Sequence, residues 1–240
     1  MKVLSDGRLL AAASFVRDGS VFADIGTDHA YLPLYLLSRG RILRAVAADI
    51  GEGPLSRAHA NIAAAGEDAR VKTVLTDGLC GLDKEGLSDV AICGMGGELI
   101  VRILSDAPFV RDPSIRLILQ PMTREAVLRR YLAESGFAIL DERPCRAAGR
   151  VYTCLCVEYD GVRRTLTDVQ AEVGCPSCGT EEEKEAFCEL LSRKIRVLTD
   201  KKEAIQAAHH TPSGSDEHLL AALLEIRNEM GNDHDGKTAL

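Results

Sequence analysis

The sequence predicts an α/β fold in which a mostly parallel sheet of seven strands is followed by a C-terminal α-helical hairpin. Three features of the 240 residues predict this fold. Apolar runs of strand length alternate with helical stretches, as in βαβ units whose sheet is buried on both faces. Two later strand-like runs are separated by only a short loop. Beyond about residue 180, apolar residues recur at spacings of three and four.

Five parallel strands are expected in the first half of the chain. They lie at residues 21–26, 44–50, 71–76, 89–94 and 116–121. The helix between the second and third strands, residues 53–66, has Pro54 in its first turn and Gly66 as its stop.

One more helix and two more strands complete the predicted sheet domain. Residues 123–136 are expected to form a helix that is capped by Thr123 and ended by Gly136. Residues 137–144 and 150–159 are expected to be strands antiparallel to each other, because the loop between them is short enough for a hairpin.

The C-terminal part is expected to be a helical hairpin. Acidic residues occupy the first turn of its first helix, which suits the positive end of the helix dipole. Side chains at spacings of three and four are Cys188, Leu191, Ile195, Leu198, Lys202 and Ile205, then Leu219, Leu223, Ile226 and Met230. The segment TPSGS separates the two helices. The expected organisation is a sheet domain in residues 1–160, a linker in 161–179, the hairpin in 180–231 and a disordered tail in 232–240.

The composition excludes several classes of protein. It is 46% hydrophobic and 27% charged, as in an ordinary globular protein. No run of about 18 apolar residues occurs, and residues 1–16 lack the pattern of a secretion signal. The protein is therefore expected to be cytoplasmic, with its eight cysteines reduced. Cys175 and Cys178 are only half of a zinc site, so no metal is expected.

The net charge of -7 argues against unspecific coating of nucleic acid, yet one stretch is basic. Residues 111–150 hold eight arginines and five acids, a net charge of +3. Arg129, Arg130, Arg146 and Arg150 are candidates there for pairing with substrate phosphates. The alternative is that the arginines occupy solvated helix and hairpin faces.

Residues 21–33, VFADIGTDHAYLP, begin like the phosphate-binding turn of a nucleotide-binding fold and then depart from it. A dinucleotide site needs further glycines for the approach of a diphosphate, whereas only Gly26 is present and Asp28 adds a negative charge. S-adenosylmethionine has no phosphate and brings a sulfonium cation and an α-amino group, which acids such as Asp24 suit. Asp49 ends the second strand, where a carboxylate can accept hydrogen bonds from both ribose hydroxyls.

Further candidates follow the third, fourth and fifth strands, at the edge where open α/β sheets bind ligands. They are Asp77 and Gly78, the segment Gly94, Met95, Gly96 and Gly97, and Gln120 with Pro121. The acid and glycine after the third strand are placed to meet the adenine of the cofactor. The glycines of the second group let the methionine part of the cofactor, or a substrate, approach the backbone. Each has a structural alternative: a helix cap for an acid, a turn for a glycine, and a core contact for His29.

Seven segments together carry a resemblance to a known family. They are LSDGRLLAAASFV, ADIGTDHAYLP, GPLSRAHANI, TDGL, ICGMGGELI, RLILQPM and GRVYTCLCVE. Over residues 4–158, this series resembles the bacterial tRNA (adenine(22)-N1)-methyltransferase family. The resemblance is specific, because DIG(S/T)DHAYLP followed by GMGG and LILQP is not a general methyltransferase pattern.

The resemblance implies a class I, Rossmann-like enzyme that uses S-adenosylmethionine to methylate N1 of an adenosine in the D-arm of tRNA. It implies a cofactor-binding role for Asp24, Gly26, His29, Asp49, Asp77 and Gly78. Asp28 falls on the proposed catalytic position, where its carboxylate would accept a hydrogen bond from the N6 amine and stabilise the cationic product. The structural alternative for Asp28 is a helix cap.

One residue departs from the family pattern. The family commonly has Asn after LILQP, and this chain has Met122. If that Asn holds the target base, its role passes to Gln120 or is lost. Two rival functions stay open: methylation of another base or a small-molecule amine, and a catalytically idle module that binds the cofactor and recruits partners through its hairpin.

Overall fold

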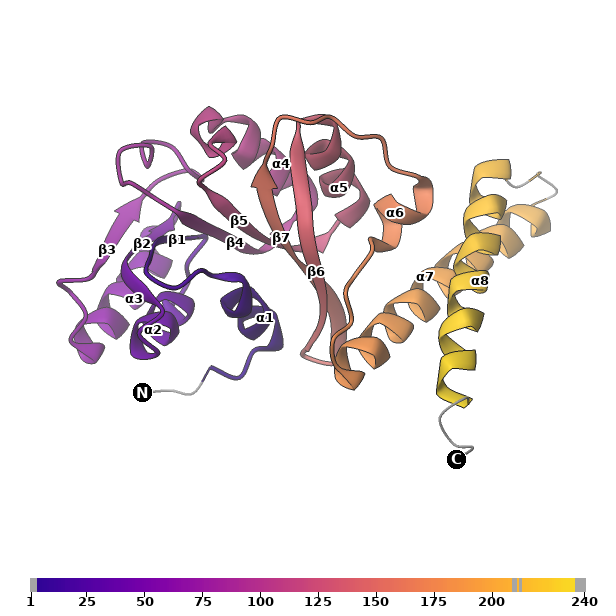
Figure 1. Cartoon of the computed structure of the whole chain (residues 1–240), viewed down its shortest axis with the longest axis horizontal. Coiled ribbons are helices and arrows are strands. Elements are labelled where there is room, and N and C mark those ends of the chain that lie inside the picture. The colour runs from indigo at the N-terminus through magenta and orange to yellow at the C-terminus, as the bar shows by residue number, and fades with distance from the viewer. Residues whose placement is uncertain (1–3, 209–210, 212, 236–240) are drawn as a thin grey trace.

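A seven-stranded sheet forms the centre of the structure, with the strand order β3-β2-β1-β4-β5-β7-β6 (Figure 1). This computed structural model describes residues 4–208, 211 and 213–235. The strands are β1 (Ser20–Ile25), β2 (Ile42–Asp49), β3 (Val71–Leu75), β4 (Asp89–Gly96), β5 (Arg116–Thr123), β6 (Phe137–Ala147) and β7 (Arg150–Tyr159). β1 to β5 pair in parallel, and β7 is antiparallel to both β5 and β6. The expected mostly parallel sheet with an antiparallel last pair is confirmed.

Helices cover both faces of this sheet. The helices of the sheet domain are α1 (Gly7–Phe15), α2 (Tyr31–Ser38), α3 (Glu52–Ala65), α4 (Gly97–Ser105), the 3-10 helix η1 (Pro108–Arg111) and α5 (Glu125–Glu134). Neighbouring residues of a strand point to opposite faces. Phe22 and Ala45 therefore pack with α1, α2 and α3, whereas Ala23 and Val46 pack with α4, η1 and α5.

Most of the expected helix boundaries are confirmed. Pro54 lies in the first turn of α3, and Gly66 ends that helix with a left-handed backbone, at a φ of 70°. Gly136 likewise has a φ of 86°, directly after Ser135, the C-cap of α5. These glycines end their helices because a residue with a Cβ is strained in this conformation.

The expected cap of α5 is wrong. Thr123 is the last residue of β5 and pairs with Gly96 of β4. The turn into α5 is made one residue later by Arg124, whose φ is 58° and whose side chain makes no capping hydrogen bond. The ladder between β4 and β5 holds Thr123 in the sheet, so it is not free to cap the helix.

The expected linker, residues 161–179, contains a short helix, α6 (Asp168–Val173). Thr167 begins it with a capping box, in which the Thr167 hydroxyl accepts from the Gln170 backbone N–H and the Gln170 side chain accepts from the Thr167 backbone N–H. Thr and Gln at this spacing are a sequence signal for a helix start.

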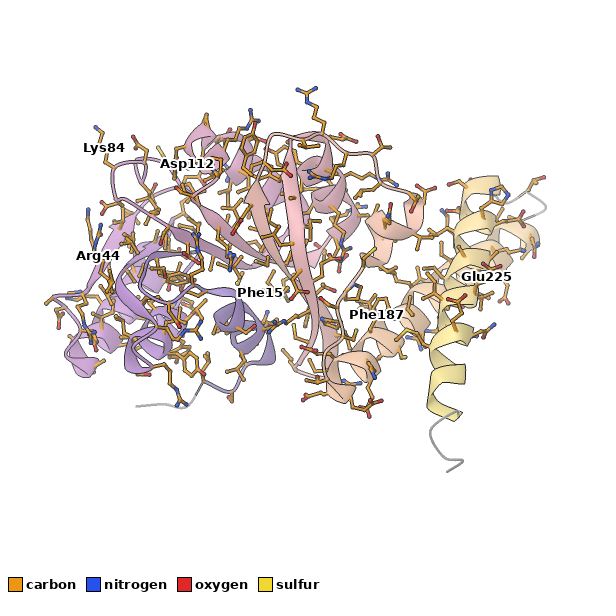
Figure 2. All side chains as sticks on the ribbon, viewed as in Figure 1. Phe15, Arg44, Lys84, Asp112, Phe187 and Glu225 are labelled. Carbon is orange, nitrogen blue, oxygen red and sulfur yellow. The ribbon has the colours of Figure 1, made fainter. Side chains whose placement is uncertain are left out.

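The helical hairpin consists of α7 (Glu181–Ala207) and α8 (Gly214–Asp235), which cross in Figure 1. A second capping box, between Thr180 and Glu183, begins α7. The hairpin has its own apolar core, in which Leu191 and Leu223 are fully buried, and this core extends to Val151 of β7. Phe187 lies on the side of α7 that faces the sheet (Figure 2).

The expected disordered tail is partly wrong. Helix α8 continues to Asp235, so residues 232–235 are helical. Residues 236–240 lie outside the described part of the chain.

Candidate functional site

The carboxyl edge of the parallel strands brings the predicted site residues together. Gly26 directly follows β1 and donates its N–H to the Ala48 carbonyl of β2 at 2.8 Å. The Gly94 N–H donates to the Gln120 side-chain carbonyl at 3.1 Å and so joins the ends of β4 and β5. A Cβ on Gly26 would overlap the methyl group of Met95. The ends of the first, second, fourth and fifth strands therefore form one continuous edge.

Two glycines at this edge have left-handed backbones. Gly26 has a φ of 78° and Gly94 a φ of 80°. The space beside Gly94 is open, since no heavy atom lies within 4 Å of the position that a Cβ would take. A ligand can therefore come close to the backbone there.

The other glycines of the predicted site have close structural neighbours. A Cβ on Gly78 would lie 3.0 Å from the Ile103 side chain, and one on Gly97 would overlap the Arg124 carbonyl. A Cβ on Gly96 would lie 3.3 Å from the Thr123 hydroxyl. Packing accounts for Gly97, whereas Gly78, which follows β3, also has a left-handed backbone with a φ of 61°.

Asp24 and Asp49 bring negative charge to the ends of β1 and β2. Asp24 is only 8% exposed, and burial raises the pKa of its carboxyl to about 6. A hydrogen bond with Thr27 lowers this pKa, and the nearby charge of Asp49 raises it. Asp49 Oδ1 accepts the Gly51 N–H at 2.7 Å. No cation pairs with Asp24 within the described residues, so a cationic ligand would relieve its buried charge.

Asp28 lies in the loop after β1, at this edge, and its carboxylate contacts two neighbouring side chains. Its Oδ1 accepts from Arg57 Nε of α3 at 3.0 Å and also from Arg57 Nη2. Its Oδ2 lies 3.3 Å from His29 Nε2, and the His29 ring stacks on Tyr31 with centroids 4.8 Å apart. The Asn61 side chain donates to the His29 carbonyl at 2.9 Å. His29 therefore touches the proposed catalytic carboxylate directly.

Asp28 does not cap α2. The N-cap of that helix is Ala30, with a φ of 54° and no side-chain capping hydrogen bond. The Ala30 N–H donates instead to the Thr27 hydroxyl at 3.2 Å. The structural alternative considered for Asp28 therefore fails, and its carboxylate is 57% exposed at the edge.

Asp77 makes a two-pronged ion pair with Arg102 of α4, with both N···O distances at 2.9 Å. This pair lowers the pKa of Asp77. A cavity of about 240 Å³ adjoins the two side chains and is also lined by Leu79 and Ile103. An adenine-binding role for Asp77 would therefore use a carboxylate that is already paired.

The ends of β4 and β5 are closed by polar and sulfur contacts. Gln120 is fully buried, and its side-chain amide donates to the Pro121 carbonyl at 2.7 Å. Met95 and Pro121 are paired residues of the two strands. The Met122 sulfur lies 3.0 Å from Arg8 Nη1 of α1. The position where the family commonly has Asn is thus in contact with the N-terminal helix.

The four candidate arginines differ in their burial and in their ion-pair partners. The prediction that Arg129 binds substrate is wrong, because Arg129 is 1% exposed and pairs with Glu142 at 2.6 Å. Arg130 pairs with Asp168, and Arg146 pairs with two acids of α7. Arg150 is exposed and has no acidic partner among the described residues. Only Arg150 could meet a phosphate without first losing a protein partner.

Sequence reasoning missed Arg57 and Arg8. Both belong to helices; Arg57 reaches Asp28 in the loop after β1, and Arg8 reaches Met122 of β5, each across many residues of the chain. Nothing in the local spacing of residues indicates these contacts.

Other classes of site can be compared with this edge. In the described part of the chain, no helix is long and apolar enough to cross a membrane. No group of three or more His, Cys, Asp and Glu side chains among the described residues could hold a metal ion. A cavity of about 710 Å³ lies between residues 4–6 and the helices α1, α2 and α3, and its lining includes Tyr31 and Asn61, which both contact His29.

The fold and the acidic carboxyl edge define a Rossmann-like methyltransferase, and a protein-family model described as a methyltransferase domain matches residues 5–155. A tRNA (adenine(22)-N(1))-methyltransferase of Bacillus subtilis is 33% identical over 162 residues, which are 65% of this chain and 68% of that protein. The chain belongs to the tRNA (adenine(22)-N1)-methyltransferase family.

Solved structures agree with this assignment. A proposed tRNA (m1A22) methyltransferase of Streptococcus pneumoniae, in complex with S-adenosyl-L-methionine, is 32% identical with a TM-score of 0.78, covering 92% of this chain and 98% of that chain. The Bacillus subtilis tRNA methyltransferase structure is 25% identical with a TM-score of 0.71, covering 96% of this chain and 99% of that chain. The similarity extends over the helical hairpin as well as the sheet domain.

Proposed function

We propose that this chain transfers a methyl group from S-adenosyl-L-methionine to N1 of the adenosine at position 22, in the D-arm of tRNA. The observation that carries the proposal is an exposed carboxylate, Asp28, at the carboxyl edge of a methyltransferase sheet whose family is tRNA-specific. The partner is therefore tRNA, and the reaction belongs to the cytoplasm.

The residues at the edge suit this cofactor. S-adenosyl-L-methionine, when bound, supplies an electrophilic methyl group on a sulfonium cation. Asp24 offers a buried negative charge that lacks a cation in the described residues. Asp49 keeps one carboxylate oxygen beyond its bond to Gly51 for a ribose hydroxyl. Gly94 leaves backbone accessible at this edge, whereas the Met95 methyl group fills the space beside Gly26. We also assign His29 and the Asp77–Gly78 turn to the cofactor side.

Asp28 is assigned the role of receiving the base. Adenine N1 has a free lone pair, so its attack needs no prior deprotonation, and the methylated base is cationic. A carboxylate that accepts from the N6 amine raises the electron density at N1 and stabilises that positive charge. We assign Gly96, at the end of β4, to the approach of the base, whereas Gly97 and Gln120 are buried. The base has to turn out of the folded tRNA, at a cost of a few kcal/mol.

The test is methylation of an unmodified tRNA transcript by the purified full-length protein with labelled S-adenosyl-L-methionine. Nucleoside analysis should give 1-methyladenosine, and reverse transcription should stop at position 22, because N1 methylation blocks Watson–Crick pairing. A matched transcript with guanosine at position 22 should take up no label. Equal labelling of the two transcripts would overturn the assigned position, and 1-methyladenosine in neither would overturn the proposed activity.

A further inference from the structure

Each oxygen of the Asp28 carboxylate has a protein neighbour in the free protein. One oxygen accepts two N–H groups of the Arg57 guanidinium, and the other lies 3.3 Å from His29 Nε2. An N6 amine that binds this first oxygen takes the place that Arg57 now holds. The Asp28 and Arg57 side chains are 57% and 50% exposed, and ion pairs this exposed contribute little to stability. Displacing Arg57 is therefore easy.

The displaced guanidinium remains close to the target nucleotide. Arg57 lies in the second turn of α3, and its Nη1 lies 3.7 Å from the position of a Cβ on Gly53, in the first turn. Its long side chain can turn away from Asp28 without movement of the helix. A guanidinium pairs with a phosphate through two parallel hydrogen bonds.

The charge of the edge requires such a cation. Asp24, Asp28 and Asp49 all lie at the ends of β1 and β2 or in the loop after β1. A base can reach Asp28 only if the phosphate of its own nucleotide comes near these acids, which repel it. A cation between the phosphate and the acids removes this repulsion.

We propose that Arg57 is a substrate-binding residue that exchanges partners: it holds Asp28 in the free enzyme and binds the backbone phosphate of the target nucleotide once the base has taken Asp28. This inference rests on the proposed function, and it adds a specific phosphate contact to it. Arg57 also has a second effect, because it keeps a positive charge beside Asp28 until the base arrives.

The test compares Arg57→Ala and Arg57→Lys with the wild type. In Arg57→Ala, KM for tRNA should rise roughly tenfold while kcat changes by less than about threefold, because the contact is lost in binding. The slope of log affinity against log salt should become shallower by about 0.7 to 0.9, as for the loss of one phosphate contact. Arg57→Lys should recover the salt slope but only part of the affinity, because an ammonium cannot make the paired contact.

Arg70→Ala is the matched control. Arg70 makes an exposed ion pair with Glu67 just beyond the other end of α3, and its side chain is 47% exposed. Its replacement removes the same charge and should leave KM and the salt slope unchanged. Equal effects of the Arg57 and Arg70 replacements, or tighter tRNA binding by Arg57→Ala, would overturn the proposal.

Binding measurements separate this proposal from the proposed function. Affinity for tRNA, measured by fluorescence anisotropy without cofactor turnover, gives the salt slope even if no methyl group is transferred. A wild-type protein that binds tRNA without methylating it would overturn the proposed function and still test Arg57. A wild-type protein that does not bind tRNA at all would overturn both.

Discussion

At the scale of single residues, Asp28 is the residue for which the structure most clearly excludes a purely structural role. Its side chain makes no contact that stabilises the start of α2, because Thr27 and Ala30 form that turn without it. Its contacts are an exposed ion pair and an adjacent histidine. Such contacts add at most about 1 kcal/mol to stability, so a large loss of activity on its replacement would have to come from the reaction.

We expect Asp28→Ala to fold normally and to lose at least about a hundredfold in single-turnover methylation, some 2.7 kcal/mol in the barrier. Its affinity for cofactor and tRNA should stay close to that of the wild type. Asp28→Asn can still accept from N6 and should fall between the two. Rapid-quench methylation at saturating tRNA, beside thermal melting, measures both effects. A variant that melts earlier but methylates at the parental rate would assign the catalytic role to another group.

Asp24 should make the free protein less stable at high pH. Its folded pKa of about 6 lies above the ordinary value of 3.8, so the native state holds this proton more tightly than the unfolded chain does. The stability from this group is full below pH 3.8 and is lost as the pH rises through 6. Asp24→Asn removes the buried charge and should gain roughly 3 kcal/mol at pH 8 and about half of that at pH 5.

Urea unfolding of both proteins at pH 5 and pH 8 measures this difference. A gain in stability that does not depend on pH would show that ionisation of Asp24 does not destabilise the fold. The same variant should bind S-adenosyl-L-methionine more weakly, because the cation loses its counter-charge. Greater stability with weaker binding is the expected trade at a functional site.

At the scale of elements, apolar runs and turn residues predicted the five parallel strands, the final hairpin of strands and the C-terminal ends of α3 and α5. These features depend on neighbours in the chain, such as Gly66 after α3. The cap of α5 could not be predicted, because only the ladder with β4 keeps Thr123 extended. Helix α6 could have been found from its Thr167 and Gln170 spacing.

In the candidate site too, features set by the order of the elements could be predicted, and contacts between distant elements could not. Parallel strands place Asp24, Asp49 and Gly94 at one edge, and this could be predicted from the order of the elements. Arg57 and Arg129 could not be assigned in this way. Each is a long side chain whose partner lies in another element, and arginine is usually exposed.

Arg129 ties three elements together. It lies in α5, pairs with Glu142 of β6 and donates to the Ala171 carbonyl of α6 at 3.0 Å. Arg129→Met should destabilise the fold by about 3 to 5 kcal/mol, because Glu142 is left buried and unpaired. Adding Glu142→Leu should restore much of this loss. Urea unfolding of the two single variants and the double variant measures the coupling.

The readout on tRNA separates a structural from a substrate role for Arg129. The double variant should bind tRNA with the affinity and salt slope of the wild type, since neither side chain reaches solvent. A stable double variant that binds tRNA more weakly than the wild type would contradict this expectation and assign Arg129 to substrate binding.

At the scale of the whole molecule, the negative charge is concentrated in the hairpin. Helices α7 and α8 hold 13 acidic and 7 basic residues, a net charge of -6 out of the -7 of the chain. Within residues 111–150, six of the eight arginines pair with an acid. The prediction that arginines of this stretch pair with substrate phosphates therefore has few free cations to support it.

Arg111 and Arg150 are the two arginines of that stretch without an acidic partner in the described residues, and they lie at opposite edges of the sheet. Arg111 precedes β5, whereas Arg150 begins β7, which runs antiparallel to β5. Arg150 is therefore at the edge that carries Asp28 and Gly94, and Arg111 is at the far edge. If tRNA lies across the carboxyl edge, Arg150 can reach a phosphate and Arg111 cannot.

We therefore expect Arg150→Ala to weaken tRNA binding several-fold at low salt and to reduce the salt slope by about 0.7 to 0.9. Arg111→Ala removes the same charge from a side chain that is also exposed and should change neither. Anisotropy titrations from about 50 to 200 mM salt measure all three slopes. Equal losses in the two variants would mean that tRNA responds to the net charge of the protein, and that the carboxyl edge does not orient it.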